Sequence, residues 1–210
     1  MGYTLDTAAA KKANAPGRIT ETGAYIGIFT RAESVLSQKN TRGIEFTFVD
    51  DEENSADYLS LWTTKENGET IFGYNVLMSL MTCLNLRGIT EKDGLVAKYD
   101  DTAKQVVNMR VPLYQELMHK RIGVLLQAEE YKARDGSIKT RMSIAGFFDP
   151  KTNLMAREIL DRKTTPEMLD KAIKRMPPVR KLSGNHAAAS GNSTSFSSGP
   201  SGTFDDDIPF

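Results

Sequence analysis

The sequence contains few of the residues that carry redox or metal chemistry. Its 210 residues include one cysteine, Cys83, and two histidines, which excludes a disulfide framework and a cysteine-rich zinc site. No apolar run reaches the ~18 residues that a membrane-spanning helix needs. The polar N-terminal segment also lacks the apolar stretch of a signal peptide. We therefore expect a soluble, intracellular protein with no membrane partner.

Candidates for catalysis or metal binding are correspondingly few. His119 lies beside Lys120, and neither it nor His186 has a metal-ligand partner at short spacing. The acidic run Asp50–Glu53 could hold a divalent cation, but a contiguous run of this kind is typical of a solvated loop. Cys83 falls among apolar residues at helical spacing, which favours a buried small hydrophobe. We expect no enzymatic activity, no metal and no cofactor.

The net charge of zero hides an uneven distribution. The chain has 27 basic and 27 acidic residues, but residues 183–210 contain three aspartates and neither lysine nor arginine. A mildly basic body therefore precedes an acidic end. Zero net charge alone would argue against a nucleic-acid partner, but this uneven distribution leaves a basic body that is compatible with one.

Hydrophobic periodicity divides the first part of the body into three strands and a helix. Alternating apolar residues predict strands, and a period near 3.6 over residues 71–87 predicts a helix that stops at Gly88. The expected strands are Ile19–Ala32, Ile44–Phe48 and Tyr58–Thr64. Residues 89–111 show neither period and are predicted to be irregular, with a short helix over residues 112–120.

A hairpin and a second helix follow. The Asp135-Gly136 pair predicts a turn between strands Arg121–Arg134 and Ile138–Asp149. Thr165 and Pro166 predict the start of a helix that ends at Pro177. Three strands, a helix and a two-stranded hairpin are the element order of the OB-fold. We therefore predict a mostly β protein with helices, in which an OB-fold-like five-stranded barrel occupies residues 19–182 after a flexible arm over residues 1–18.

The amino-acid composition changes after Leu182. Of the last 28 residues, seven are serine and four are glycine, with no hydrophobic periodicity. Such a segment cannot bury enough apolar surface to fold, so we predict a disordered tail over residues 183–210.

The end of this tail has the chemistry of a short linear ligand. Phe210 can enter an apolar pocket, its carboxylate can be held by an arginine or lysine, and Pro209 lowers the ordering cost of binding. A solubilising acidic tail is the simpler alternative. The residues predicted to bind a partner are Asp205, Asp206, Asp207, Ile208, Pro209 and Phe210.

The last seven residues resemble the C-terminal tip of bacterial single-stranded-DNA-binding proteins of the enterobacterial type. Phe210 and Pro209 match the pocket-filling pair, and the three aspartates match the acidic stretch. The resemblance implies an OB-fold body that coats single-stranded DNA and a tip that recruits replication, recombination and repair proteins.

The body departs from that bacterial family. The usual N-terminal strand is missing, and residues 89–120 are not laid out as expected, so the body looks more like a phage-encoded single-stranded-DNA-binding protein. The resemblance then implies host or phage partners, met at replicating DNA in the cytoplasm of a bacterial host. It leaves open whether the protein is a homo-oligomer.

The DNA-binding face is predicted from the residues themselves. Single strands require basic residues for phosphates and exposed rings for base stacking. Tyr58 and Trp62 alternate with two leucines and are predicted to face outward, although Trp62 could instead close one end of the core. Phe46 and Phe48 share a face with Ile44 and are assigned to the core.

The remaining candidates lie in the basic turn and the hairpin. Tyr131 is predicted to lie opposite the apolar face of its strand, and part of the next strand is predicted to present basic residues opposite Met142 and Ile144. Each charge alone is most simply a solvated surface residue, and only their grouping with aromatic rings indicates an interface. These candidates are Lys39, Arg42, Tyr131, Lys132, Arg134, Lys139, Arg141 and Phe147.

The sequence thus predicts a non-enzymatic protein that binds single-stranded DNA with little sequence preference. Two alternatives remain: a decoy whose tip occupies host docking sites without DNA binding, and a factor that anneals complementary strands. We also consider that the acidic tail folds back on the basic groove. In that case tail deletion would tighten DNA binding, and unchanged affinity and salt dependence would reject the idea.

Overall fold

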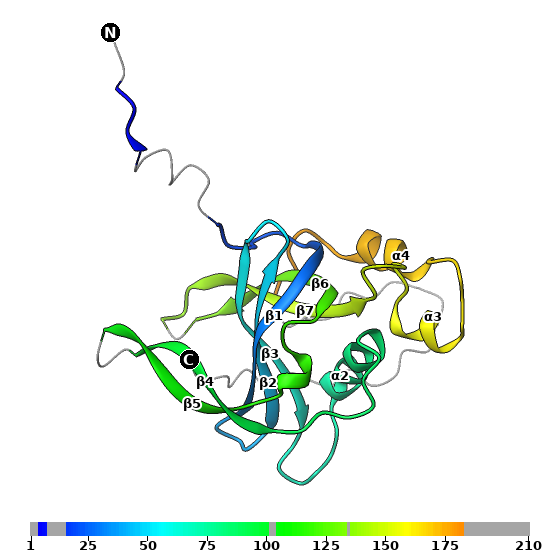
Figure 1. The fold of residues 1–210 in the computed structure, drawn as a ribbon, viewed down its shortest axis with the longest axis horizontal. Coiled ribbons are helices and arrows are strands. Elements are labelled where there is room, and N and C mark those ends of the chain that lie inside the picture. The colour runs from blue at the N-terminus through cyan, green and yellow to red at the C-terminus, as the bar shows by residue number, and fades with distance from the viewer. Residues whose placement is uncertain (1–3, 8–15, 101–103, 134, 183–210) are drawn as a thin grey trace, which may run out of the picture.

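The computed structural model describes residues 4–7, 16–100, 104–133 and 135–182. Most of the predicted arm over residues 1–18 and the whole predicted tail over residues 183–210 lie outside these ranges. The described part of the chain is mostly β, as expected, with antiparallel strands and a few helices (Figure 1). No strand ladder among the described residues joins the two ends of the sheet, which is therefore open rather than a closed barrel.

The first three strands form the expected meander. β1 (Gly23–Leu36), β2 (Arg42–Asp50) and β3 (Ser55–Thr64) pair in succession. β1 starts and ends four residues later than predicted. Ile19 lies outside β1, and its backbone N–H donates to the Ser55 carbonyl oxygen at 2.8 Å. The first part of β1, from Gly23 to Ile28, pairs with β6, and Gly27 and Ile28 also pair with β2 on the other side.

The predicted hairpin near the end of the body is confirmed. β6 (Arg121–Lys132) and β7 (Ile138–Phe148) pair from Gly123↔Phe148 to Lys132↔Ile138. Gly136 in the turn has φ +82°, a conformation that glycine adopts without strain.

The prediction that residues 89–111 are irregular is wrong. β4 (Lys92–Asp100) and β5 (Gln105–Leu113) form a second hairpin, which extends away from the body in Figure 1. Among their described side chains only Val96 and Leu113 are buried, so no apolar alternation marks them. The short helix expected over residues 112–120 is reduced to one 3₁₀ turn, η1 (Gln115–Leu117).

The described part of the chain contains three α-helices. α2 (Phe72–Cys83) confirms the predicted helix and packs Val76, Leu77, Leu80 and Met81 against the core. Gly73 permits this approach, because a Cβ there would lie 1.9 Å from the Trp62 carbonyl oxygen. α3 (Ala156–Leu160) was not expected. α4 (Met168–Arg175) starts two residues after Pro166 and packs Leu169 on Leu125 and Phe148.

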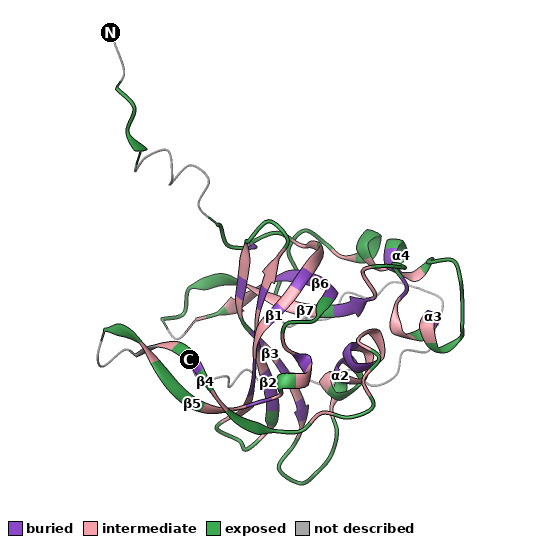
Figure 2. Cartoon of the chain, viewed as in Figure 1, coloured by how far each residue is buried: buried purple, intermediate pink, exposed green. Residues whose placement is uncertain are grey.

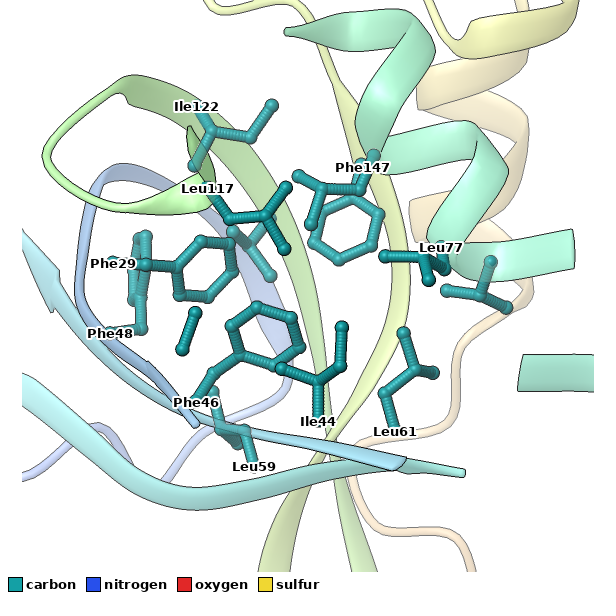
Figure 3. Packing of buried hydrophobic residues seen from close by; sticks show 14 of the residues in the cluster. Phe29, Ile44, Phe46, Phe48, Leu59, Leu61, Leu77, Leu117, Ile122 and Phe147 are labelled. Carbon is teal, nitrogen blue, oxygen red and sulfur yellow. The ribbon is translucent and has the colours of Figure 1, made fainter. Parts of the chain in front are cut away.

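Four phenylalanines form the centre of the main core (Figure 3). The ring of Phe29 lies 4.5 Å from that of Phe46, 5.6 Å from that of Phe48 and 6.2 Å from that of Phe147, measured between centroids. The core assignment of Phe46 and Phe48 is therefore confirmed. Figure 2 shows the same division, with buried residues inside the sheet and exposed residues along the β4–β5 hairpin.

Glu158 organises the segment between α3 and α4. Its carboxylate is 1% exposed and accepts backbone N–H bonds from Met155 at 3.0 Å, Glu167 at 2.7 Å and Met168 at 3.0 Å. Burial alone would raise the pKa of Glu158, but these three donors hold it below its ordinary value. The stability that this carboxylate contributes is therefore present above the carboxyl pKa of the unfolded chain. It is lost as the pH falls through the lower pKa of the folded state.

We expect Glu158→Gln to lower the free energy of unfolding by about 1–3 kcal/mol at pH 7, because charged acceptors form the stronger hydrogen bonds. Below the folded-state pKa the difference should shrink, since the wild-type group is then also neutral. Urea unfolding at neutral and at acidic pH measures the loss of stability at pH 7 and its decrease at low pH. Glu69→Gln, in an exposed pair with Lys65, is the control and should change stability little. A loss that is equal at both pH values would contradict the assignment.

Candidate nucleic-acid interface

The β1–β2–β3 meander has one face in the core and one face outside it. Leu59 and Leu61 point into the core, whereas Tyr58 and Trp62 lie on the outer face, as predicted. The cross-strand register places the outer residues in three rows. These rows are Arg31, Thr47 and Tyr58; Glu33, Glu45 and Ser60; and Val35, Gly43 and Trp62.

Tyr58 projects from a bulge in β3. Two residues, Asp57 and Tyr58, lie opposite the single residue Thr47 of β2, and Tyr58 has a left-handed φ of 58°. Its side chain is 64% exposed. The Arg31 guanidinium lies 5.9 Å from the ring centroid, within the range of a cation–π contact. The ring is therefore accessible to a base and has a positive charge beside it.

The charges around Arg31 are mutually compensated. Arg31 donates to Glu33 at 3.3 Å and to Glu45 at 2.6 Å, and Lys98 of β4 donates to both Glu33 oxygens at 3.0 Å. Two cations and two carboxylates thus alternate on the outer face. The sequence reasoning missed Arg31, because a bulge between Phe29 and Arg31 breaks the alternation of β1. It missed Lys98 because no strand was expected there.

Trp62 lies half-buried against Gly43, its partner on β2. A Cβ on Gly43 would lie 2.7 Å from the indole Cε3, so only glycine leaves room for the ring in this position. The side chain lies on the face away from the core, contrary to the alternative that it closes one end of the core. Its buried Nε1 has no hydrogen-bond partner among the described residues.

The two basic residues of the first turn lie at the same end of the sheet as Trp62. Arg42 opens β2 opposite Thr64 and is exposed, and Lys39 is exposed in the turn before it. Asn40 of this turn donates to Glu66 at 2.9 Å, which links the turn to the segment after β3. The structure therefore brings Lys39 and Arg42 near Trp62.

The β6–β7 hairpin places a tyrosine and two basic residues on one face. Tyr131 is opposite Lys139, and Glu129 is opposite Arg141, so these four side chains share a face, as the predicted alternation requires. The Arg141 guanidinium lies 5.3 Å from the Tyr131 ring centroid and donates to Glu129 at 3.0 Å. Lys139 forms a 3.7 Å ion pair with Asp135.

One further predicted residue of this hairpin, Lys132, does not join that face. Lys132 is paired with Ile138 and lies on the opposite face. Arg134 lies outside the described residues.

The assignment of Phe147 to the DNA-binding face is wrong. Its side chain is fully buried beside Phe29. The register passes from Leu126↔Ile144 to Leu125↔Gly146, which leaves Ala145 as an extra residue in β7. This bulge reverses the alternation and turns Phe147 to the same side as Met142 and Ile144, into the core.

The described residues offer little support for a reactive thiol, a metal site or a membrane-spanning helix. Burial, with a smaller effect from the charge of Asp149, raises the pKa of Cys83 to about 12, so its thiol is unreactive at neutral pH. The part of the chain that the structure describes holds no cluster of three metal-ligating side chains. None of its helices has the length and apolarity to cross a membrane.

No protein-family model matches this chain, and no curated protein matches it.

Proposed function

We propose that the protein binds single-stranded DNA with little sequence preference. Binding would use the outer face of β1–β2–β3 and the face of the β6–β7 hairpin that carries Tyr131. The observation that carries the proposal is the pairing of each tyrosine, Tyr58 and Tyr131, with an arginine guanidinium beside its ring. A ring can stack on any base, and a guanidinium beside the ring adds a cation–π contribution, a combination used in sequence-tolerant binding of single strands.

We further propose that the sheet is an open OB-fold with an insertion. Without the β4–β5 hairpin, the element order is three strands, α2 and a two-stranded hairpin, with β6 paired to the start of β1. OB-folds bind oligonucleotides through the loop between the first two strands and the loop of the final hairpin. Lys39 lies in the first of these loops, and Tyr131 and Lys139 flank the second, which supports the placement of the site.

The C-terminal tip supplies the second part of the function. Its likeness to the tips of bacterial single-stranded-DNA-binding proteins supports recruitment of replication, recombination and repair proteins of the host or phage, in the bacterial cytoplasm. The tip residues Asp205 to Phe210 lie outside the described residues, so this part is supported by sequence alone. The paired rings and guanidinium groups favour a body that itself binds DNA over a decoy that acts only through its tip.

The decisive test is a titration of the full chain with an oligo-dT strand at low and high salt, followed by anisotropy and by tryptophan emission. We expect binding that weakens as salt rises, because phosphate contacts release counterions. Quenching of Trp62, the only tryptophan, would place the DNA on the outer face. Absence of binding at both salt concentrations would contradict the proposal and favour the decoy.

A second measurement separates coating from annealing. Two complementary labelled strands are mixed with and without the protein, and their pairing is followed by energy transfer. Pairing that the protein slows or leaves unchanged supports coating, whereas faster pairing would identify an annealing factor.

A further inference from the structure

The sheet has a free edge at β4. In the strand order β4 is outermost, with β5 as its neighbour among the described strands. The register pair Glu33↔Leu113 and the ion pairs Lys98–Glu33 and Lys92–Glu116 tie this hairpin to the body. A two-stranded ribbon is only marginally stable in water, and an unpaired edge presents N–H and C=O groups to any strand that can reach it.

The centre of this edge lacks protective charges. Residues Gly94–Ala97 of β4 are uncharged, and Leu95 is 68% exposed. β7, which pairs only with β6, carries Lys139 and Arg141 along its exposed part. Charged side chains are a usual device against edge-to-edge pairing. The two hairpins therefore differ, since β7 is protected against pairing and the middle of β4 is not.

We propose that β4 pairs in antiparallel fashion with β4 of a second copy of this chain, about a two-fold axis at Val96. Symmetric antiparallel pairing must place one residue opposite its own copy, which leaves few registers. Centring the pair on Val96 puts Gly94 opposite Lys98 at both ends, so no like charges of residues 92–98 lie opposite each other. The same register puts Leu95 opposite Ala97.

The neighbouring registers are less favourable. Centring on Leu95 would place Lys92 opposite Lys98, a pair of like charges. Centring on Ala97 would place the apolar Val96 opposite Lys98 and leave Lys92 without a β4 partner. The register at Val96 joins two marginal ribbons into one four-stranded sheet. The proposal rests on the fold and the edge sequence and does not depend on DNA binding.

Measuring the oligomeric state of the full chain tests whether the β4 edge joins two copies of the chain. We expect sedimentation to show a monomer–dimer equilibrium, and Leu95→Lys to raise its dissociation constant about tenfold or more, through lost apolar burial and charge repulsion. Val106→Lys is the matched control, since Val106 is 65% exposed on β5, one strand away from the edge. Its effect should be small. A chain that stays monomeric, or a dimer that Leu95→Lys leaves unchanged, would overturn the proposal.

Cross-linking tests the register. In a Cys83→Ser background, Val96→Cys should give a covalent dimer on mild oxidation, because the axis places each residue 96 beside its copy. Met109→Cys, at the β5 partner of Val96 and more exposed than it, should not. Cross-linking that is no faster at residue 96 than at residue 109 would also overturn the proposal. These variants keep the β4 surface uncharged, so they answer the question even if Leu95→Lys perturbs the hairpin.

Discussion

Replacement of Phe147 by alanine is expected to lower the free energy of unfolding by about 3–5 kcal/mol, the range for a large aromatic side chain removed from a well-packed core. The ring is fully buried, its centroid lies 6.2 Å from that of Phe29, and the surrounding side chains come from several strands and α2. A cavity bordered by so many separate elements cannot collapse easily. Urea unfolding, followed by circular dichroism, measures the loss.

The same substitution separates a core role from a DNA-binding role. Phe147→Leu keeps most of the apolar volume and should retain both the fold and the affinity for oligo-dT. If Phe147→Ala instead left stability nearly unchanged and weakened DNA binding, the ring would have to lie at the surface, and the position of the bulge at Ala145 would be wrong.

Phe147 shows the limit of arguing from alternation. A strand alternates its faces only while each residue has one partner, and an extra residue reverses the pattern beyond it. Ala145 is such a residue, and nothing in the local sequence marks it. Arg141 precedes the bulge on β7, and Tyr131 lies on β6, which has no extra residue at this step, so both point where the alternation placed them. The sequence therefore predicted the faces correctly up to the irregularity and wrongly after it.

The β4–β5 hairpin was missed for a different reason. Hydrophobic periodicity detects strands that bury one face, and this ribbon buries little. By contrast, the strands and helix that enclose the phenylalanine core were all expected, because burial imposes their pattern. The order of those elements was predictable from sequence, whereas the ribbon between α2 and β6 was not.

At the candidate site, the outward positions of Tyr58, Trp62 and Tyr131 were predicted, but the charges beside them were predicted only in part. Tyr58 and Trp62 were placed on the correct face by simple alternation with leucines. Arg31 and Lys98 meet Glu33 through pairings that are distant in sequence, and no local pattern reports such contacts. Predicted basic residues also have carboxylate partners, as Lys139 has Asp135 and Arg141 has Glu129. Counting lysines and arginines thus overestimates the charge that is free to meet phosphate.

The double substitution Tyr58→Ala and Tyr131→Ala is expected to abolish most of the affinity for single-stranded DNA. Each stacked base contributes about 1–3 kcal/mol by alanine substitution. Each single variant should therefore raise the dissociation constant about 5- to 150-fold. The two rings lie on different elements, so their effects should add when both stack on one strand. Anisotropy titrations with oligo-dT at a fixed salt concentration measure all three variants.

Two variants are the controls for this prediction. Tyr74→Ala removes an exposed tyrosine from α2, away from the proposed face, and should leave affinity unchanged. Tyr58→Phe keeps the ring without its hydroxyl and should keep binding, because stacking does not use the hydroxyl. Alanine meets about the same steric penalty as tyrosine at a φ of 58°, so the bulge itself should persist. The salt slope should also persist, since phosphate contacts set it. A double variant that binds like the wild type would move the site away from both tyrosines and would remove the main support for the proposed function.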